Sequence, residues 1–111
     1  MVARIDDERL NRVFKALSDP TRRDILRRTA LGEVSVSGLA ADYEMSFAAV
    51  QKHVSVLEKA GLVSKFTAGR ERRVRAAPDE LARARDCLQQ LEALWRRRVD
   101  ALDALLSESE D

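Results

Sequence analysis

The residues best suited to chemistry in this chain lie within MSFAAVQKHVSVLEKAGLV, residues 45–63. The Gln51 amide can form paired hydrogen bonds with an adenine edge, and Lys52 can reach guanine or a phosphate oxygen. Small side chains beside them allow close approach and can touch a thymine methyl group. The set supports non-covalent reading of double-stranded DNA and comprises Ser46, Phe47, Ala48, Ala49, Gln51, Lys52 and Ser55.

Arginines after Gly69 form the second candidate set. Arg70, Arg72 and Arg73 make a basic patch that the net charge of +1 hides. We expect them to contact phosphates or to enter the minor groove. The alternative is a charged turn that is simply solvated.

Arg22 and Arg23 are a further basic pair, for which two interpretations stay open. Both can contact phosphate groups of DNA. Alternatively, they pair with Asp19, with Asp24 or with the acidic C-terminal region.

His53 and Cys87 are the one histidine and the one cysteine of the chain. We expect His53 to make a structural or phosphate-side hydrogen bond. Cys87 is expected to be a buried small apolar side chain, and a thiol switch across a dimer is the alternative. One thiol and one imidazole do not suffice for a four-ligand soft-metal site. We therefore expect no metal and no cofactor.

Motifs of catalysis and of membrane insertion are not found in the sequence. It has no Gly-rich phosphate loop and no nucleophile–base motif, so we expect no enzyme. No apolar run approaches the ~20 residues of a membrane span, and no signal peptide is recognisable. We expect a cytoplasmic protein without a membrane partner.

The first candidate set needs a helix to present it, and residues 46–60 predict one. Ser46 can cap its start, and Gly61 can adopt the left-handed conformation that ends it. Apolar residues recur at three- and four-residue steps and form one face: Phe47, Val50, Val54 and Leu57. Phe47 lies at the border of that face, so packing in the core or turn competes with a base contact.

Residues 37–61 predict a helix-turn-helix, in which Ser37 caps a short helix before the longer one. Val34 and Val36 precede it in a short extended piece that can add a third strand. Residues 62–77 predict a wing of two strands joined by a glycine turn.

Both ends of the chain predict dimerisation helices, over residues 1–17 and 78–106. The second helix carries apolar residues at seven-residue steps, with a complementary set between them that Arg98 interrupts. The expected interface consists of Leu81, Leu88, Leu91, Trp95, Leu102 and Leu105. An apolar ridge ~40 Å long exceeds what a small domain needs. The alternative is a helix that lies back over its own core.

The length of 111 residues predicts a single domain over residues 1–111. Apolar residues make up 45% of the chain and charged residues 35%, which excludes a disordered composition. The predicted fold class is mainly α with a small β-hairpin. It is a winged helix-turn-helix with about five helices, dimeric through its terminal helices.

The chain resembles the ArsR-type (ArsR/SmtB) winged helix-turn-helix repressors. The matching segments are FKALSDPTRRDIL at residues 14–26 and MSFAAVQKHVSVLEKAGLVSKFTAGRERRVRAAP at residues 45–78. The resemblance implies a homodimer that binds an operator and blocks transcription. It also implies an effector, often a metal ion, and a recognition helix whose front and early turns enter the major groove.

The chain departs from the metal-sensing pattern of that family. The third-helix region, SVSGLAADYEM, has no cysteine or histidine, and the last helix has no histidine. The ending LEALWRRRVDALDALL looks like a non-metal branch, whose effector is unknown. We expect a DNA-binding repressor at an inverted repeat with half-sites ~34 Å apart. The alternative is a protein-interaction module that uses the same scaffold without reading DNA.

Overall fold

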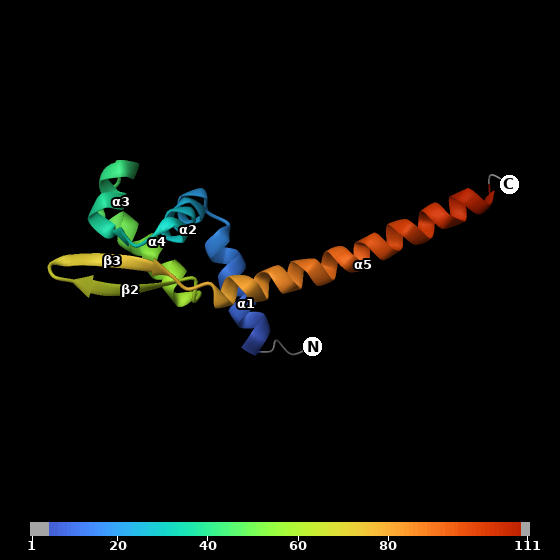
Figure 1. Cartoon of the computed structure of the whole chain (residues 1–111), viewed down its shortest axis with the longest axis horizontal. Coiled ribbons are helices and arrows are strands. Elements are labelled where there is room, and N and C mark those ends of the chain that lie inside the picture. Colours follow the sequence, from blue (N-terminus) through green and yellow to red (C-terminus); the bar gives the residue numbers. More distant parts are fainter. Residues whose placement is uncertain (1–4, 110–111) are drawn as a thin grey trace.

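The computed structural model describes residues 5–109, which form five helices and three strands (Figure 1). In chain order these are α1 Ile5–Leu17, α2 Pro20–Leu31, β1 Val34–Ser35, α3 Val36–Tyr43, α4 Phe47–Lys59, β2 Val63–Ala68, β3 Glu71–Ala76 and α5 Asp79–Ser109. The predicted mainly α winged helix-turn-helix fold is confirmed. Residues 1–4 of the expected first helix lie outside the described residues.

The core lies between α1–α4 and the inner face of the sheet. Its largest fully buried side chains come from five elements: Val13, Ile25, Val36, Leu39, Val50, Val54, Leu57 and Val74. Three of these, on α4, follow helical spacing, which turns one face of that helix inward. The core therefore buries the apolar face of α4, called its back below, and leaves the opposite face, its front, at the surface.

The sheet is antiparallel in the order β1-β3-β2, so the predicted third strand is confirmed. β1 is shorter than expected, because only Val34 and Ser35 pair with β3. Val36, expected in the extended piece, is instead the first residue of α3 and is fully buried. The helix cap is Ser35, whose hydroxyl accepts a hydrogen bond from the Gly38 N–H at 3.0 Å, and not Ser37.

Both ends of α4 have the local structure that the sequence predicts. The Ser46 hydroxyl accepts a hydrogen bond from the Ala49 N–H at 3.1 Å. At the other end, Gly61 has a φ of 77°. Its N–H donates to the Glu58 carbonyl, and the Leu62 N–H donates to the Leu57 carbonyl. This pair of bonds is the Schellman motif, which satisfies carbonyls that a helix end leaves open.

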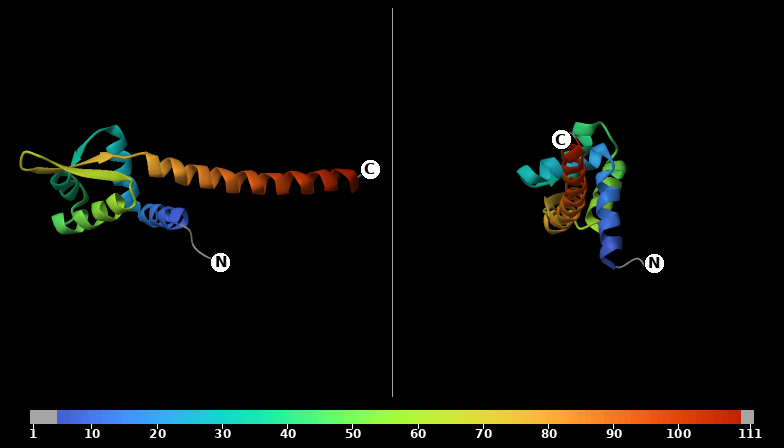
Figure 2. Two further views of the ribbon diagram at one scale, coloured as in Figure 1. Left: turned by 90° about the horizontal axis from the view of Figure 1, so that it is seen from below. Right: turned by 90° about the vertical axis from the view of Figure 1, so that its right-hand side faces the viewer.

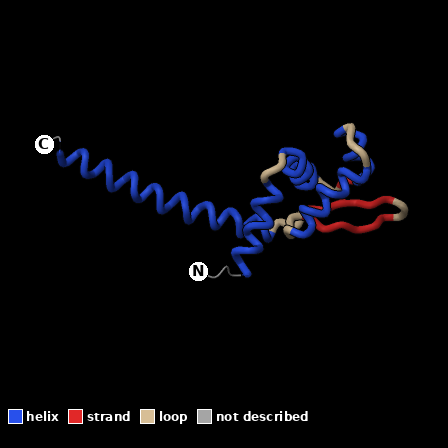
Figure 3. Tube along the Cα trace, turned by 180° about the vertical axis from the view of Figure 1, so that it is seen from behind, coloured by secondary structure: helices blue, strands red, loops and turns tan. Residues whose placement is uncertain are grey.

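The α5 helix projects away from the body on the side opposite the β2–β3 hairpin (Figures 2 and 3). It makes the molecule long, with extents of 72 × 33 × 20 Å. Ala84 is its one buried residue, and residues 88–109 are all exposed. Neither α5 nor any other described helix is apolar enough over a sufficient length to cross a membrane.

Candidate nucleic-acid interface

The front of α4 is a mixed surface of small, hydroxyl and cationic side chains. The exposed members of the first candidate set are Ser46, Phe47, Ala48 and Lys52, and the half-buried members are Ala49, Gln51 and Ser55. Phe47 is 44% exposed and stands outside the buried core, so the core packing that was one of its two expected roles is not observed. As the first residue of α4, it lies at the edge of the face that the core covers.

Gln51 differs from its neighbour Lys52 in how its polar atoms are placed. Its Oε1 is buried and has no hydrogen-bond partner within the described part of the chain. An unsatisfied buried acceptor costs roughly 1–3 kcal/mol. Rotation of the amide toward a base edge would remove that cost. Lys52, by contrast, is exposed.

The three arginines of the wing are not equivalent, because side chains of a strand alternate between its faces. Arg73 lies opposite Phe66 in the ladder. Its guanidinium is 2.8 Å from the Glu71 carboxylate and donates to the Glu33 carbonyl at 3.4 Å. Arg70 and Arg72 are exposed and have no ion pair or side-chain hydrogen bond within residues 5–109.

The face of the wing that carries Arg73 is further neutralised by its neighbours. The Arg75 guanidinium lies 4.0 Å from the centre of the Phe66 ring and 3.4 Å from the Glu33 carboxylate. Cationic charge on this face is therefore already matched by carboxylates and a ring. The unmatched charge of the hairpin belongs to Arg70 and Arg72.

Arg22 and Arg23 cap the end of α1 with their side chains. Arg22 donates from Nε to the Ala16 carbonyl at 2.8 Å and from Nη2 to the Lys15 carbonyl at 3.0 Å. Arg23 donates from Nη1 to the Leu17 carbonyl at 2.7 Å. The last carbonyls of a helix lack partners within the helix, so these arginines satisfy them instead of pairing with aspartates. Any phosphate contact has to compete with these bonds.

His53 of α4 lies against the same junction. Its Nδ1 is 3.3 Å from Nη1 of Arg22 and 3.9 Å from the Asp19 carboxylate. This contact supplies the structural hydrogen bond expected of His53. The Asp19 carboxylate caps α2 by accepting a hydrogen bond from the backbone N–H of Arg22. This hydrogen bond, and after it the nearby charges of His53 and Arg22, lower the pKa of Asp19. The recognition helix is thus tied to the α1–α2 corner.

A polar cluster joins α2 to α3, which sequence reasoning missed. The Asp24 carboxylate accepts from the Tyr43 hydroxyl at 2.5 Å and from Arg28 Nε at 3.0 Å. Arg28 also lies 2.6 Å from Asp42. Burial, then the hydrogen bond to Asp24, raises the pKa of Tyr43 to about 12. The Tyr43 hydrogen bond, then Arg28, lowers the pKa of Asp24.

The apolar residues of α5 stand uncovered in the single chain. All six residues of the expected interface are between 44% and 71% exposed, with Trp95 the most exposed. Cys87, expected to be buried, is half-buried because it lies where α5 leaves the body. The described residues contain no group of three or more His, Cys, Asp or Glu side chains that could hold a metal ion.

Known proteins that are similar to this chain in sequence are transcription regulators. A helix-turn-helix domain model matches residues 17–65. The HTH-type transcriptional regulator Rv2034 of Mycobacterium tuberculosis is 37% identical over 102 residues, 91% of this chain and 92% of that protein. The transcriptional repressor SdpR of Bacillus subtilis is 35% identical over 60 residues, 54% of this chain and 67% of that protein.

Solved structures agree with the sequence relatives. An ArsR-like regulator from Rhodococcus sp. RHA1 is 38% identical, with a TM-score of 0.74 over 88% of this chain and 92% of its own. The homodimeric winged helix-turn-helix domain of Mb0332 from Mycobacterium bovis is 28% identical, with a TM-score of 0.62 over 78% of this chain and 80% of its own. The chain therefore belongs to the ArsR-type family of winged helix-turn-helix transcriptional regulators.

Proposed function

We propose that this regulator is a homodimeric repressor that binds an inverted-repeat operator in double-stranded DNA. One observation carries the proposal. The α4 helix is anchored by a fully buried back and shows a polar front, while Arg70 and Arg72 of the wing have no partner in the described chain. A helix of this kind fits the major groove, and unpaired arginines suit phosphates.

In this proposal each segment of one domain, residues 1–111, has a distinct task. Residues 37–61 read base edges through Ser46, Phe47, Ala48, Ala49, Gln51, Lys52 and Ser55. Residues 62–77 form the wing, which contacts phosphates through Arg70, Arg72 and Arg73. Arg70 and Arg72 make the stronger contacts, since Arg73 is already paired. The protein acts by occupying DNA in the cytoplasm, not by catalysis.

The dimer is proposed to form through the expected terminal segments, residues 1–17 and 78–106, which contain α1 and most of α5. Leu81, Leu88, Leu91, Trp95, Leu102 and Leu105 present an exposed apolar set, interrupted at Arg98, that a second copy of the helix would cover. The relative Mb0332 is described as homodimeric, which supports the same assembly here. Repression is supported by the relative SdpR, a transcriptional repressor. The effector stays unassigned.

Selection of bound duplexes from a random pool tests the proposal. We expect an inverted repeat with half-sites about one helical turn, ~34 Å, apart. Replacing Gln51 with Ala should relax base preference at one position per half-site, at a cost of about 1–3 kcal/mol. Lys52→Ala should weaken binding, and Lys59→Ala, at the far end of α4, is its matched control. Recovery of no duplex at low salt would overturn the proposal.

A further inference from the structure

The α5 helix is attached to the body over a short distance. Glu80 and Cys87 are half-buried, Ala84 is buried, and residues 88–109 are exposed. These three residues follow four- and three-residue steps, so they form one face, and α1 packs against α5. The direction in which α5 leaves the body is therefore decided at this junction.

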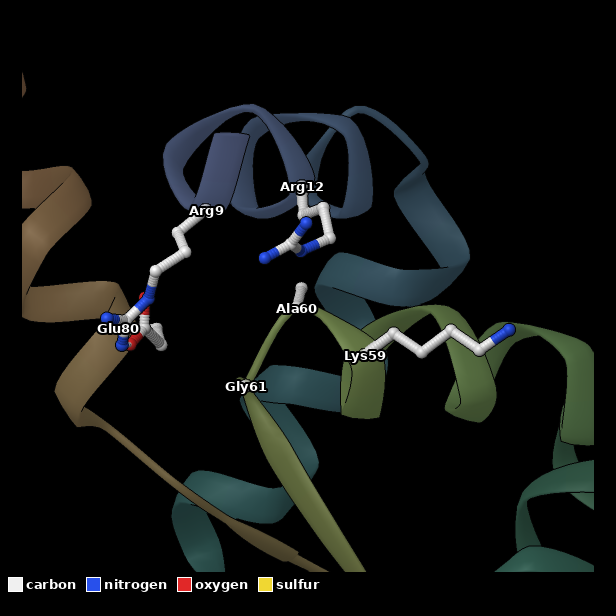
Figure 4. A pocket seen from close by; sticks show the side chains of 6 residues that line it. All are labelled: Arg9, Arg12, Lys59, Ala60, Gly61 and Glu80. Carbon is white, nitrogen blue, oxygen red and sulfur yellow. Dashed lines mark hydrogen bonds and ion pairs between the residues drawn. The ribbon is translucent and has the colours of Figure 1, made fainter. Parts of the chain in front are cut away.

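Glu80 joins three elements at the junction (Figure 4). Its carboxylate accepts a hydrogen bond from Arg9 of α1, with which it also forms an ion pair. Arg83, one turn further along α5, lies 3.8 Å from the same carboxylate oxygen. The Glu80 side chain is 14% exposed, so the body covers most of it.

The aliphatic part of Glu80 rests on the end of the recognition helix. A Cβ added to Gly61 would lie 2.6 Å from Glu80 Cγ, a distance at which atoms clash. Gly61 is the residue that ends α4, and the next residue, Leu62, accepts a hydrogen bond from the Ala77 N–H at 3.0 Å. The end of α4 and the start of α5 are thus in direct contact.

We propose that Glu80 is a positioning residue that sets the spacing between the two recognition helices of the dimer, by packing on Gly61 while Arg9 holds its carboxylate. The inference rests on the proposed dimeric repressor. It goes beyond it by naming the residues that decide which operator spacing is bound.

The length of α4 makes a small change at this junction large at the DNA. With 13 residues, α4 spans ~20 Å at ~1.5 Å per residue. If α4 rotates by ~10° about its C-terminal end, its N-terminal end moves by about 3.5 Å. This displacement is close to the ~3.4 Å rise of one base pair. The dimer doubles this displacement, because both protomers turn.

The test uses the half-site recovered with the full chain, placed twice in duplexes whose spacing changes in one-base-pair steps. Glu80→Gln keeps the aliphatic contact with Gly61 and removes the charge, and Arg9→Gln removes the partner. The exchange Arg9→Glu with Glu80→Arg restores a pair. Arg12→Gln is the matched control, because Arg12 lies one turn from Arg9 on α1 and has no ion pair in the described chain. Fluorescence anisotropy gives each Kd.

We expect the wild type and Arg12→Gln to prefer one spacing over its neighbours by about tenfold or more, since a mismatch must be absorbed by bending or twisting DNA. Glu80→Gln and Arg9→Gln should shift the preferred spacing or reduce the preference to about threefold. Both should bind a single half-site like the wild type, and the exchange should restore the preference.

An unchanged spacing profile in both single variants would overturn the inference. Equal loss of affinity at every spacing would also overturn it, because that result indicates a general effect on stability. A wild type that gains nothing from a second half-site would instead overturn the proposed dimeric repressor, and this inference with it.

Discussion

The difference between Arg72 and Arg73 gives the sharpest prediction about the wing. The two residues are neighbours with the same charge, yet Arg73 is held by Glu71 and the Glu33 carbonyl while Arg72 is exposed without a partner in residues 5–109. Arg72→Ala should therefore remove a phosphate contact that Arg73→Ala does not.

The magnitude follows from counterion release. Each neutralised phosphate contributes about 0.9 to the slope of log Kd against log salt, so losing one contact per protomer lowers the slope of a dimer by about 1.8. If wild type and variant bind equally at 1 M salt, this difference in slope makes the variant about 30-fold weaker at 0.15 M salt, or ~2 kcal/mol. For Arg73→Ala we expect a slope change below about 0.5.

The assay is fluorescence anisotropy of one selected duplex over a series of salt concentrations. Both variants should keep the base preference of the wild type, because phosphate contacts carry no sequence information. Thermal melting by circular dichroism shows whether each variant is folded. A slope change for Arg73→Ala equal to or larger than that for Arg72→Ala would refute the assignment of charge to the two faces of the wing.

Three further predictions concern dimerisation, titration and folding. Trp95→Ala should weaken the dimer by about 2 kcal/mol per protomer, measured by sedimentation equilibrium, since a tryptophan that a partner buries near the centre of an interface often dominates the binding energy. An unchanged dimer would contradict this. Tyr43 is the one tyrosine, so its phenolate absorbance should titrate with a midpoint at about 12 in the folded protein and near ~10 in denaturant. Because the pKa is raised on folding, the associated stability is complete below pH ~10 and is lost as the pH rises toward the folded value; a folded midpoint at the unfolded value would contradict this. Gly61→Ala should destabilise by more than Gly69→Ala in urea unfolding, because both have positive φ but only Gly61 meets Glu80. Left-handed strain alone costs about 1–2 kcal/mol, and equal losses would refute the contact.

Much of the fold follows from short-range signals in the sequence. Ser46 and Gly61 mark the ends of α4 because capping depends on residues within one helical turn. The wing follows from a glycine turn between two strands, and α5 from apolar residues at seven-residue steps. Ser35 and Ser37 show where such signals are ambiguous. Both can cap a helix, and burial of Val36 selects the earlier start.

The sequence also separated the two faces of α4 almost completely. Val50, Val54 and Leu57 are buried and Lys52 is exposed, as the helical period predicts. Phe47 lies at the border of the apolar face as predicted, but the helical period cannot tell whether the covering elements reach it. The amide of Gln51 predicts a base contact from its chemistry, but the burial of its Oε1 depends on neighbours that the sequence does not place.

The partners of side chains that reach from one helix to another were decided by the tertiary structure alone. The sequence left phosphate contact and pairing with acidic residues open for Arg22 and Arg23, but the fold brings both to the open carbonyls at the end of α1. Arg9 and Glu80 are separated by 71 positions and meet only because α1 packs on α5. Local periods and caps act over a few residues and are written in the sequence. Long-range contacts depend on the angles at which packed helices cross, and these are established only when the core is complete.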